Sequence, residues 1–273
     1  NIHGTEFENS ILRLAEGKKV TYNTVQNQLK HLGWEINDEY CVLLIQLSES
    51  DILNATEKYI SVLFENTLNE SQSILFDSNI LSIINKTRLK MADIEFKKLI
   101  SGFLESNNLK GGLSLSFSNF TELGQYFSQA KACLEIGSRL DSKRNLYCYE
   151  DHAVHHLFQT CAANMDIKKT CHPSVVALLE HDRIHGTDYF NTLHVFLSKD
   201  RNLVASSKAL FIHRNTLVMR MNKIKEMLNA DLDDDRTRLY MLLSCKLLDY
   251  VNTNKHELLY SLPEKAGSHR AKG

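Results

Sequence analysis

Three consecutive polar residues near the middle of the C-terminal half could bind the edges of DNA bases: Arg214, Asn215 and Thr216. An arginine can donate two hydrogen bonds to O6 and N7 of guanine. An asparagine can pair with N6 and N7 of adenine, and a threonine can contact a thymine methyl group or a phosphate. If these residues open a helix, its free backbone amides also favour a phosphate. The pattern therefore predicts contacts to both the bases and the backbone of a duplex.

The residues that follow predict the helix that positions these side chains. Four apolar residues recur at the spacing of one buried helical stripe, Leu217, Met221, Ile224 and Leu228. At roughly 100° per residue, the opposite face carries Asn215, Met219, Asn222 and Glu226. The N-terminal part of such a helix enters the major groove first in a helix-turn-helix. We predict eight DNA-binding residues, His213, Arg214, Asn215, Thr216, Met219, Arg220, Asn222 and Lys223.

A shorter helix over residues 203–210 is predicted to precede this one, with a turn at 211–213 between them. Its small residues would let another helix approach closely, as a helix-turn-helix requires. Nearby basic residues would add a phosphate attraction that weakens as salt rises, namely Arg201, Lys208, Arg220, Lys223 and Lys225. The pattern by itself is equally compatible with a surface helical hairpin whose charges are simply solvated.

A family resemblance favours DNA binding over this alternative. The run ALFIHRNTL at 209–217, followed by RMNKI at 220–224, resembles the C-terminal helix-turn-helix signature of PucR-type and sugar-diacid (CdaR-type) bacterial regulators. The flanking residues 192–197 and 232–239 fit as well. Met219 stands where the family usually has Tyr, and Ser206 and Ser207 stand where Ala is usual. The resemblance implies a transcription regulator that binds a duplex operator.

The overall composition limits how such a protein could bind DNA. The 273 residues carry a formal net charge of -1, so affinity must come from a local patch or from pairing two copies. Six cysteines occur without a CxxC pair, which suggests reduced cytosolic thiols. No apolar run approaches about 18 residues, which predicts a soluble, cytoplasmic protein with no membrane partner. The predicted partners are double-stranded DNA and a second copy of the chain.

The first half of the chain predicts an α+β domain. Strands are expected over 41–47, 73–76, 80–84, 111–117 and 146–149, with helices over 52–68, 92–105 and 121–139 between them. This order predicts a ferredoxin-like or nucleotidyl-cyclase-like sheet with helices on one face. The segments Gly112–Phe117 and Ala130–Gly137 also resemble the degenerate GGDEF-like domain of CdaR-type regulators.

Catalysis is not expected of this sheet domain. A cyclase needs carboxylates that hold two metal ions and a glycine-led loop beside a triphosphate. The predicted hairpin contains only Asp77-Ser78-Asn79, and Gly111-Gly112 is followed by no carboxylate. We therefore predict no enzyme activity and no cofactor. Retained binding of a nucleotide or another small ligand remains an alternative, as does a protein-interaction module whose helical end docks another protein.

A histidine pair offers a second possible chemistry. His181 and His185 are four residues apart, so both could reach one metal ion from a single helical face. No third ligand is identifiable, and histidines on exposed or linking helices are the more common explanation of such a pair. The prediction is that the chain holds no metal.

The predicted organisation has five segments. They are N-terminal linker helices (1–36), a degenerate GGDEF-like domain (37–151), linking helices (152–186), the helix-turn-helix domain (187–256) and a flexible tail (257–273). The linking helices could pack within the C-terminal bundle or act as a lever that sets the separation of two DNA-reading heads. Because the chain opens with Asn inside an apparent helix, we expect a longer protein whose effector sensor lies upstream.

Overall fold

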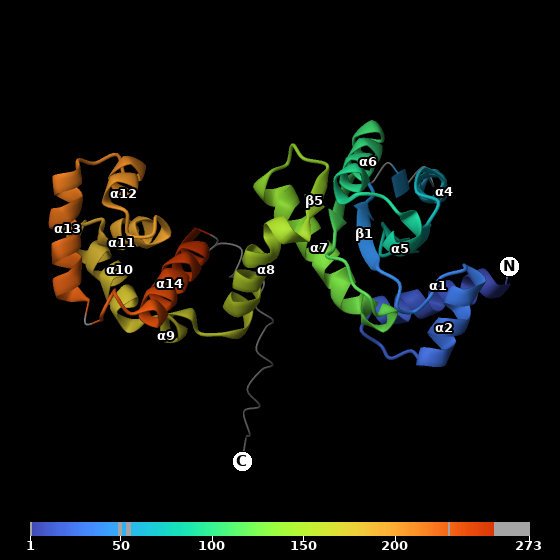
Figure 1. Ribbon diagram of the computed structural model, residues 1–273, viewed down its shortest axis with the longest axis horizontal. Coiled ribbons are helices and arrows are strands. Elements are labelled where there is room, and N and C mark those ends of the chain that lie inside the picture. Colours follow the sequence, from blue (N-terminus) through green and yellow to red (C-terminus); the bar gives the residue numbers. More distant parts are fainter. Residues whose placement is uncertain (1, 49–50, 53–55, 229, 254–273) are drawn as a thin grey trace, which may run out of the picture. The chain divides into compact units, whose positions relative to one another are not determined.

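The computed structural model describes residues 2–48, 51–52, 56–228 and 230–253 (Figure 1). The chain divides into two compact units, Asn1–His156 and Leu157–Gly273, which we call the sheet unit and the helical unit. The boundary falls within α8 (Tyr149–Asn164). An α+β sheet domain followed by an all-α domain with a helix-turn-helix was the predicted fold class, and it is confirmed. The tail predicted over 257–273 lies outside the described residues.

A five-stranded sheet organises the sheet unit. Its strands are β1 (Tyr40–Gln46), β2 (Ser71–Phe76), β3 (Asn79–Asn85), β4 (Lys110–Leu113) and β5 (Leu146–Cys148), in the spatial order β2-β3-β1-β4-β5. The first four strands pair antiparallel, and β5 pairs parallel with β4. Helix α4 (Glu57–Thr67) connects β1 to β2, and α6 (Asp93–Ser106) lies between β3 and β4. This βαββαβ order is the predicted ferredoxin-like one.

The hairpin between β2 and β3 has a turn one residue shorter than the predicted Asp77-Ser78-Asn79 connection, because Asn79 already belongs to β3. Phe76 pairs with Asn79, so Asp77 and Ser78 form a two-residue turn. Both have left-handed backbones, with φ of 50° and 61°. Two left-handed residues in succession give a turn whose twist matches that of the flanking strands. The short turn α5 (Lys86–Leu89) follows β3.

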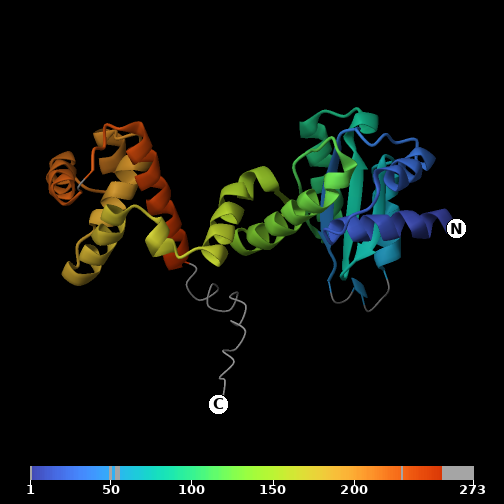
Figure 2. The same ribbon diagram turned by 90° about the horizontal axis from the view of Figure 1, so that it is seen from below.

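Helices cover both faces of the sheet, so the prediction that one face carries the helices is wrong (Figures 1 and 2). Val42 and Leu44 of β1 belong to a core with α1 (Ile2–Ala15), α2 (Tyr22–His31) and α7 (Leu123–Leu140). Leu43 and Ile45 belong to a second core with α4 and α6. The physical reason is the unbroken apolar sequence of β1, which is buried at every position from Tyr40 to Ile45.

Strand β4 is shorter than predicted, because the strand expected over 111–117 ends at Leu113. The Ser114 hydroxyl oxygen accepts a hydrogen bond from the amide of Val42 at 2.9 Å and donates to the Leu115 carbonyl. Phe117 meets Tyr40 again in an isolated bridge. A short 3-10 turn, η1 (Phe120–Glu122), then leads into α7. The Ser114 hydroxyl group therefore takes the place of a backbone acceptor for the Val42 amide, between β4 and the bridge at Phe117.

The helical unit contains the end of α8 and six further helices in its described part. They are α9 (Ile167–Thr170), α10 (Pro173–His185), α11 (Tyr189–Ser198), α12 (Leu203–Ala209), α13 (Arg214–Met227) and α14 (Asp235–Thr253). Their shared core contains Leu193, Leu217, Ile224 and Met241, each of which is fully buried. None of the described helices has the length and apolarity needed to cross a membrane.

The cysteines are free thiols and lie in both units. Burial raises the pKa of Cys41, Cys133 and Cys245 to about 12. A thiol with such a pKa is protonated at neutral pH and is therefore unreactive. These cysteines act as small apolar side chains, as their places in apolar runs predicted.

Candidate nucleic-acid interface

Helix α12 begins and ends with specific hydrogen bonds. The Asn202 side chain accepts from the amides of Val204 and Ala205, both at 3.0 Å, and so caps the N-terminus. At the other end, the Ile212 amide donates to the Ser207 carbonyl at 3.1 Å. Phe211, between them, has a left-handed backbone with φ of 54°. This is the helix-ending arrangement that usually contains glycine, and it turns the chain sharply toward α13.

Helix α13 begins at the three predicted base-contacting residues. His213 is its N-cap, and the ring atom Nδ1 accepts a hydrogen bond from the Asn215 amide at 3.2 Å. The predicted stripe of Leu217, Met221, Ile224 and Leu228 is buried against the helical core. Figure 1 shows α13 at the outer edge of the helical unit, joined to α12 by the short turn. Burial of one stripe fixes which side chains face outward.

The outward side chains form a surface that we call the reading face. It consists of Arg214, Asn215, Thr216, Met219, Asn222 and Lys223, all of which are exposed. Helix α13 contains four basic residues and one acidic residue, so it is positively charged within a nearly neutral chain. Lys223 donates to Glu226 at 2.8 Å, and this bond raises the pKa of Lys223. The reading face therefore combines hydrogen-bond donors, acceptors and positive charge.

Arg220 differs from the other predicted contact residues, because it is partly buried and bonded to the protein itself. Its Nη1 atom donates to Oδ2 of Asp188 at 3.2 Å and to Oγ1 of Thr192 at 3.1 Å. Thr192 is fully buried and donates in turn to the Asp188 carbonyl. Arg220 thus connects α13 to the first turn of α11. His213 likewise has an internal role, as the cap of α13.

The start of α11 is fixed by a carboxylate from α10. Asp182 Oδ1 accepts from the Tyr189 amide at 2.9 Å, and Oδ2 accepts from the Phe190 amide at 2.6 Å. Thr187 also donates to this carboxylate. Sequence reasoning missed Asp182, Asp188 and Thr192. An aspartate or threonine at a helix start is a recognisable capping signal, but nothing in the sequence pairs Asp188 with Arg220.

The other basic residues have different surroundings. Arg201 donates to Oδ1 of Asp233 at 2.5 Å and to the Leu232 carbonyl at 3.2 Å. It therefore holds the loop before α14 rather than presenting a free charge. Lys208 and Lys225 are exposed. Among the five predicted sources of phosphate attraction, Arg201 and Arg220 are thus bonded to other segments of the protein, and Lys223 is bonded to Glu226 within α13.

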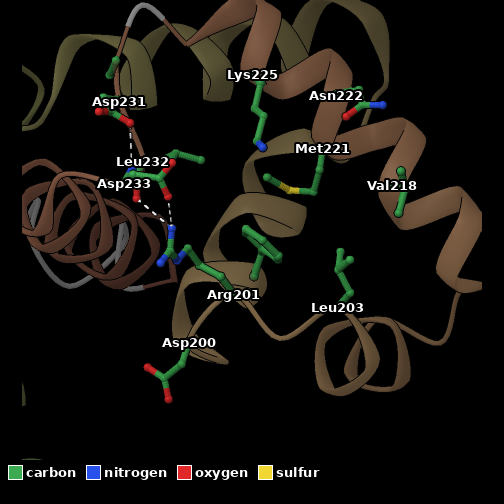
Figure 3. Close-up of a pocket in the computed structure, with 12 residues that line it drawn as sticks. Asp200, Arg201, Leu203, Val218, Met221, Asn222, Lys225, Asp231, Leu232 and Asp233 are labelled. Atoms are coloured by element: carbon green, nitrogen blue, oxygen red, sulfur yellow. Dashed lines mark hydrogen bonds and ion pairs between the residues drawn. The ribbon is translucent and has the colours of Figure 1, made fainter.

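A pocket of about 610 Å³ lies beside α13 (Figure 3). Its apolar lining comes from Phe196, Leu203, Val218, Met221 and Leu232, and its polar lining includes Asn222 and Lys225. Figure 3 shows the Lys225 ammonium group directed into this space and the Arg201 guanidinium held by the loop. The pocket separates the C-terminal half of α13 from the loop that leads to α14.

The histidine pair of α10 has protein partners. The rings of His181 and His185 stack with centroids 4.1 Å apart. Nδ1 of His181 lies 3.1 Å from Oγ1 of Thr187, and Nδ1 of His185 lies 3.0 Å from the His181 carbonyl oxygen. Within the described part of the chain, no group of three or more His, Cys, Asp or Glu side chains is placed to hold a metal ion.

Residues 189–247 match the family described as the PucR C-terminal helix-turn-helix domain. The match runs from the first residue of α11 into α14 and includes the reading face. The geometry and this match together define a helix-turn-helix domain of bacterial regulator type. The resemblance to PucR-type regulators predicted from the HRNTL run is therefore confirmed for this part of the chain.

Three relatives are similar over longer stretches. The proline-responsive transcriptional activator PutR of Bacillus subtilis (strain 168) is 23% identical over 187 residues, which are 65% of this chain and 46% of the relative. The carbohydrate diacid regulator of Escherichia coli (strain K12) is 29% identical over 151 residues, 54% of this chain and 38% of the relative. The DNA-binding transcriptional activator AdeR of Bacillus subtilis (strain 168) is 21% identical over 227 residues, 79% and 53% respectively. The chain thus spans about half or less of each relative's length.

Proposed function

We propose that the chain is the DNA-binding part of a bacterial transcription regulator, and that it recognises a duplex operator through α13. The observation that carries this proposal is the arrangement of Arg214, Asn215 and Thr216. All three are exposed at the N-terminal end of a helix whose other side is anchored in the core. In a helix-turn-helix, this end enters the major groove. The match to a helix-turn-helix family and to named transcriptional activators supports the same conclusion.

The proposed contacts divide into three kinds. Arg214 and Asn215 hydrogen-bond to base edges, with Thr216 and Asn222 beside them. Lys223 and the exposed Lys208 and Lys225 attract phosphates. His213 and Arg220 act indirectly, because His213 caps α13 and Arg220 joins it to α11. Direct contacts thus come from exposed side chains, of which Lys223 would exchange its ion pair with Glu226 for a phosphate.

We further propose that the sheet unit is a non-catalytic, GGDEF-like scaffold. The ferredoxin-like strand order and the two-residue Asp77-Ser78 turn support this assignment. Such a turn leaves no loop that could cradle a triphosphate. We also propose that a small-molecule effector acts outside these two units, and that the protein binds chromosomal DNA in the cytoplasm.

Two copies are proposed to bind together, because a single head buries a small interface on DNA. Helix α14 carries exposed Leu239, Tyr240 and Leu243, and the two leucines are one helical turn apart. Such a stripe can pair with its own copy about a twofold axis. Sedimentation velocity, with and without DNA, measures whether the bound species contains two chains.

A gel-shift titration tests the proposed function. The 273-residue chain is mixed with genomic promoter fragments at several salt concentrations. We expect at least one fragment to bind specifically, and Arg214→Ala and Asn215→Ala each to weaken that binding by about five- to 150-fold, which corresponds to about 1–3 kcal/mol per base contact. Lys131→Ala removes a positive charge from the exposed side of α7, in the sheet unit, and is the matched control. If no fragment binds at any salt concentration, the protein-docking alternative replaces this function.

A further inference from the structure

Two large apolar side chains of the α12–α13 pair are exposed beside the polar residues of the reading face. Phe211 in the turn is 94% exposed, and Met219 on α13 is 73% exposed. Phe211 precedes Arg214 by three residues, and Met219 follows Asn215 by one helical turn. Neither contributes to the helical core. Their exposure places apolar surface next to groups suited to base edges.

The backbone conformation of Phe211 is strained, which adds a second observation to the exposure of its ring. Its φ of 54° lies in the left-handed region, which glycine adopts readily and in which a residue with a side chain is strained. The turn bonds that end α12 involve backbone atoms, so glycine at this position would support them equally well. Within the chain, the phenylalanine ring therefore adds strain and buries nothing. Strain retained at an exposed position points to a contact outside the chain.

Duplex DNA is the occupant that the neighbouring residues favour. The turn and the first two turns of α13 form the end that enters the major groove. In that groove, the thymine methyl group is the apolar feature of the base edges, and phenylalanine is among the side chains that contact it. Asn215, between the two apolar residues in sequence, suits adenine. An apolar side chain that contacts thymine and an asparagine that binds adenine together fit a site rich in A·T pairs.

We propose that Phe211 and Met219 recognise thymine methyl groups in the operator. This inference rests on the proposed DNA-binding function and adds the chemistry of the bases that are read. It requires thymines at two positions in the operator. The recognition involves no hydrogen bond, so it depends only on the methyl groups themselves.

Deoxyuridine substitution tests this inference directly, because deoxyuridine differs from thymidine only by the missing methyl group. The 273-residue chain first selects duplexes from a random-sequence pool. Each thymine of the selected duplex is then replaced singly by deoxyuridine, and affinity is measured by titration. We expect about a fourfold loss at each of two positions, the value for one buried methyl-sized group.

Two variants show which side chain contacts which of the two thymines. Phe211→Gly removes the ring while allowing the left-handed backbone, so the variant should unfold at the same temperature as the parent chain or higher. It should bind the thymine duplex more weakly and lose sensitivity to deoxyuridine at one position. Met219→Ala should lose sensitivity at the other position. Ile184→Ala, which removes a 75% exposed apolar side chain from α10, should retain both sensitivities.

Each other outcome overturns the inference. If deoxyuridine changes affinity at no position while Arg214→Ala still weakens binding, the function stands and thymine recognition is wrong. If Phe211→Gly binds as tightly as the parent chain, the ring faces something other than DNA, such as a protein. If Phe211→Gly weakens binding equally to the thymine duplex and to the deoxyuridine-substituted duplex, the ring contacts the sugar-phosphate backbone. If no duplex is selected, the proposed function fails together with this inference.

Discussion

The guanidinium group of Arg220 lies 3.2 Å from Oδ2 of Asp188, the residue that immediately precedes α11. The same guanidinium nitrogen reaches the buried hydroxyl group of Thr192. Asp182 of α10 in turn accepts hydrogen bonds from the first amides of α11. These bonds together link α13 to α11 and α11 to α10, and so help to set the orientation of α13. A change in any of these bonds would alter how the reading face meets a duplex, even though none of the residues need touch DNA.

Arg220→Ala and Asp188→Asn test whether Arg220 positions α13 or binds phosphate. If Arg220 only positions the helix, both variants should lower the free energy of unfolding by about 1 kcal/mol, as expected for a partly exposed ion pair with a further hydrogen bond. Both should weaken DNA binding to a similar extent and keep the parent salt dependence. Urea unfolding and DNA titrations at several salt concentrations provide these measurements. A salt slope reduced by about one in Arg220→Ala alone would show a direct phosphate contact.

Ser206→Ala should stabilise the helical unit. Ser206 is fully buried, and its hydroxyl group has no hydrogen-bond partner among the described residues. Burying an unpaired hydroxyl group costs about 1–3 kcal/mol, and alanine removes that cost while retaining the small volume that α12 needs. We expect a gain of about 1 kcal/mol in urea unfolding.

Ser244→Ala is the control for Ser206, because it removes a buried hydroxyl group that is bonded. Ser244 accepts from the His172 amide at 2.8 Å and donates to the Tyr240 carbonyl at 2.8 Å. Its substitution should lower the free energy of unfolding by about 1–3 kcal/mol, because the His172 amide loses its partner. Equal effects of the two substitutions would contradict the structural difference between them.

Gly112→Ala should destabilise the sheet unit, because β4 and α7 approach closely at this residue. A Cβ atom on Gly112 would lie 2.1 Å from the Ala130 carbonyl oxygen and 2.8 Å from Cβ of Leu134. Overpacking of this kind costs about 1–3 kcal/mol or more, since the obstructing atoms include backbone. Gly102→Ala in α6 is the matched control, because among the described residues no atom beyond its chain neighbours and its own helix backbone lies within 4 Å of the added Cβ. It should stabilise the helix by about 0.5–1 kcal/mol, and thermal unfolding measures both changes.

The helical unit should lose stability in mild acid, partly through His172. The ring atom Nδ1 of His172 accepts from the Ser174 amide at 3.2 Å and caps α10, while burial lowers the pKa of His172 below its usual 6.5. The unfolded chain therefore binds the proton more readily. Stability is present above the unfolded pKa and is lost as pH falls from about 6.5 through the folded pKa.

His172→Asn isolates this contribution, because asparagine caps a helix without titrating in that range. Between about pH 7 and about pH 5, the free energy of unfolding should fall less in this variant than in the parent chain. Burial also lowers the pKa of His194, so part of the acid sensitivity should remain. A variant with the full acid sensitivity of the parent would exclude His172 as a contributor.

Much of the fold follows from local sequence patterns. Within the segment predicted to hold linking helices, α10 begins at Pro173 and ends at His185, because proline favours a first turn and Gly186 adopts the left-handed ending. The β2–β3 hairpin was predictable from two apolar runs around Asp77-Ser78. The covering of both sheet faces was missed, although the unbroken apolar run of β1 carried that signal.

The sequence alone also determined which side of α13 faces outward, since a buried stripe repeats with the 3.6-residue period of a helix. Only the tertiary structure decided which of the polar residues are free to bind. Arg220 and Arg201 resemble the other basic residues in the sequence, but their partners Asp188 and Asp233 lie 32 residues away along the chain. The left-handed backbone of Phe211 likewise depends on how α12 ends. Periodicity is local, whereas ion pairs and strained turns depend on residues that folding brings together.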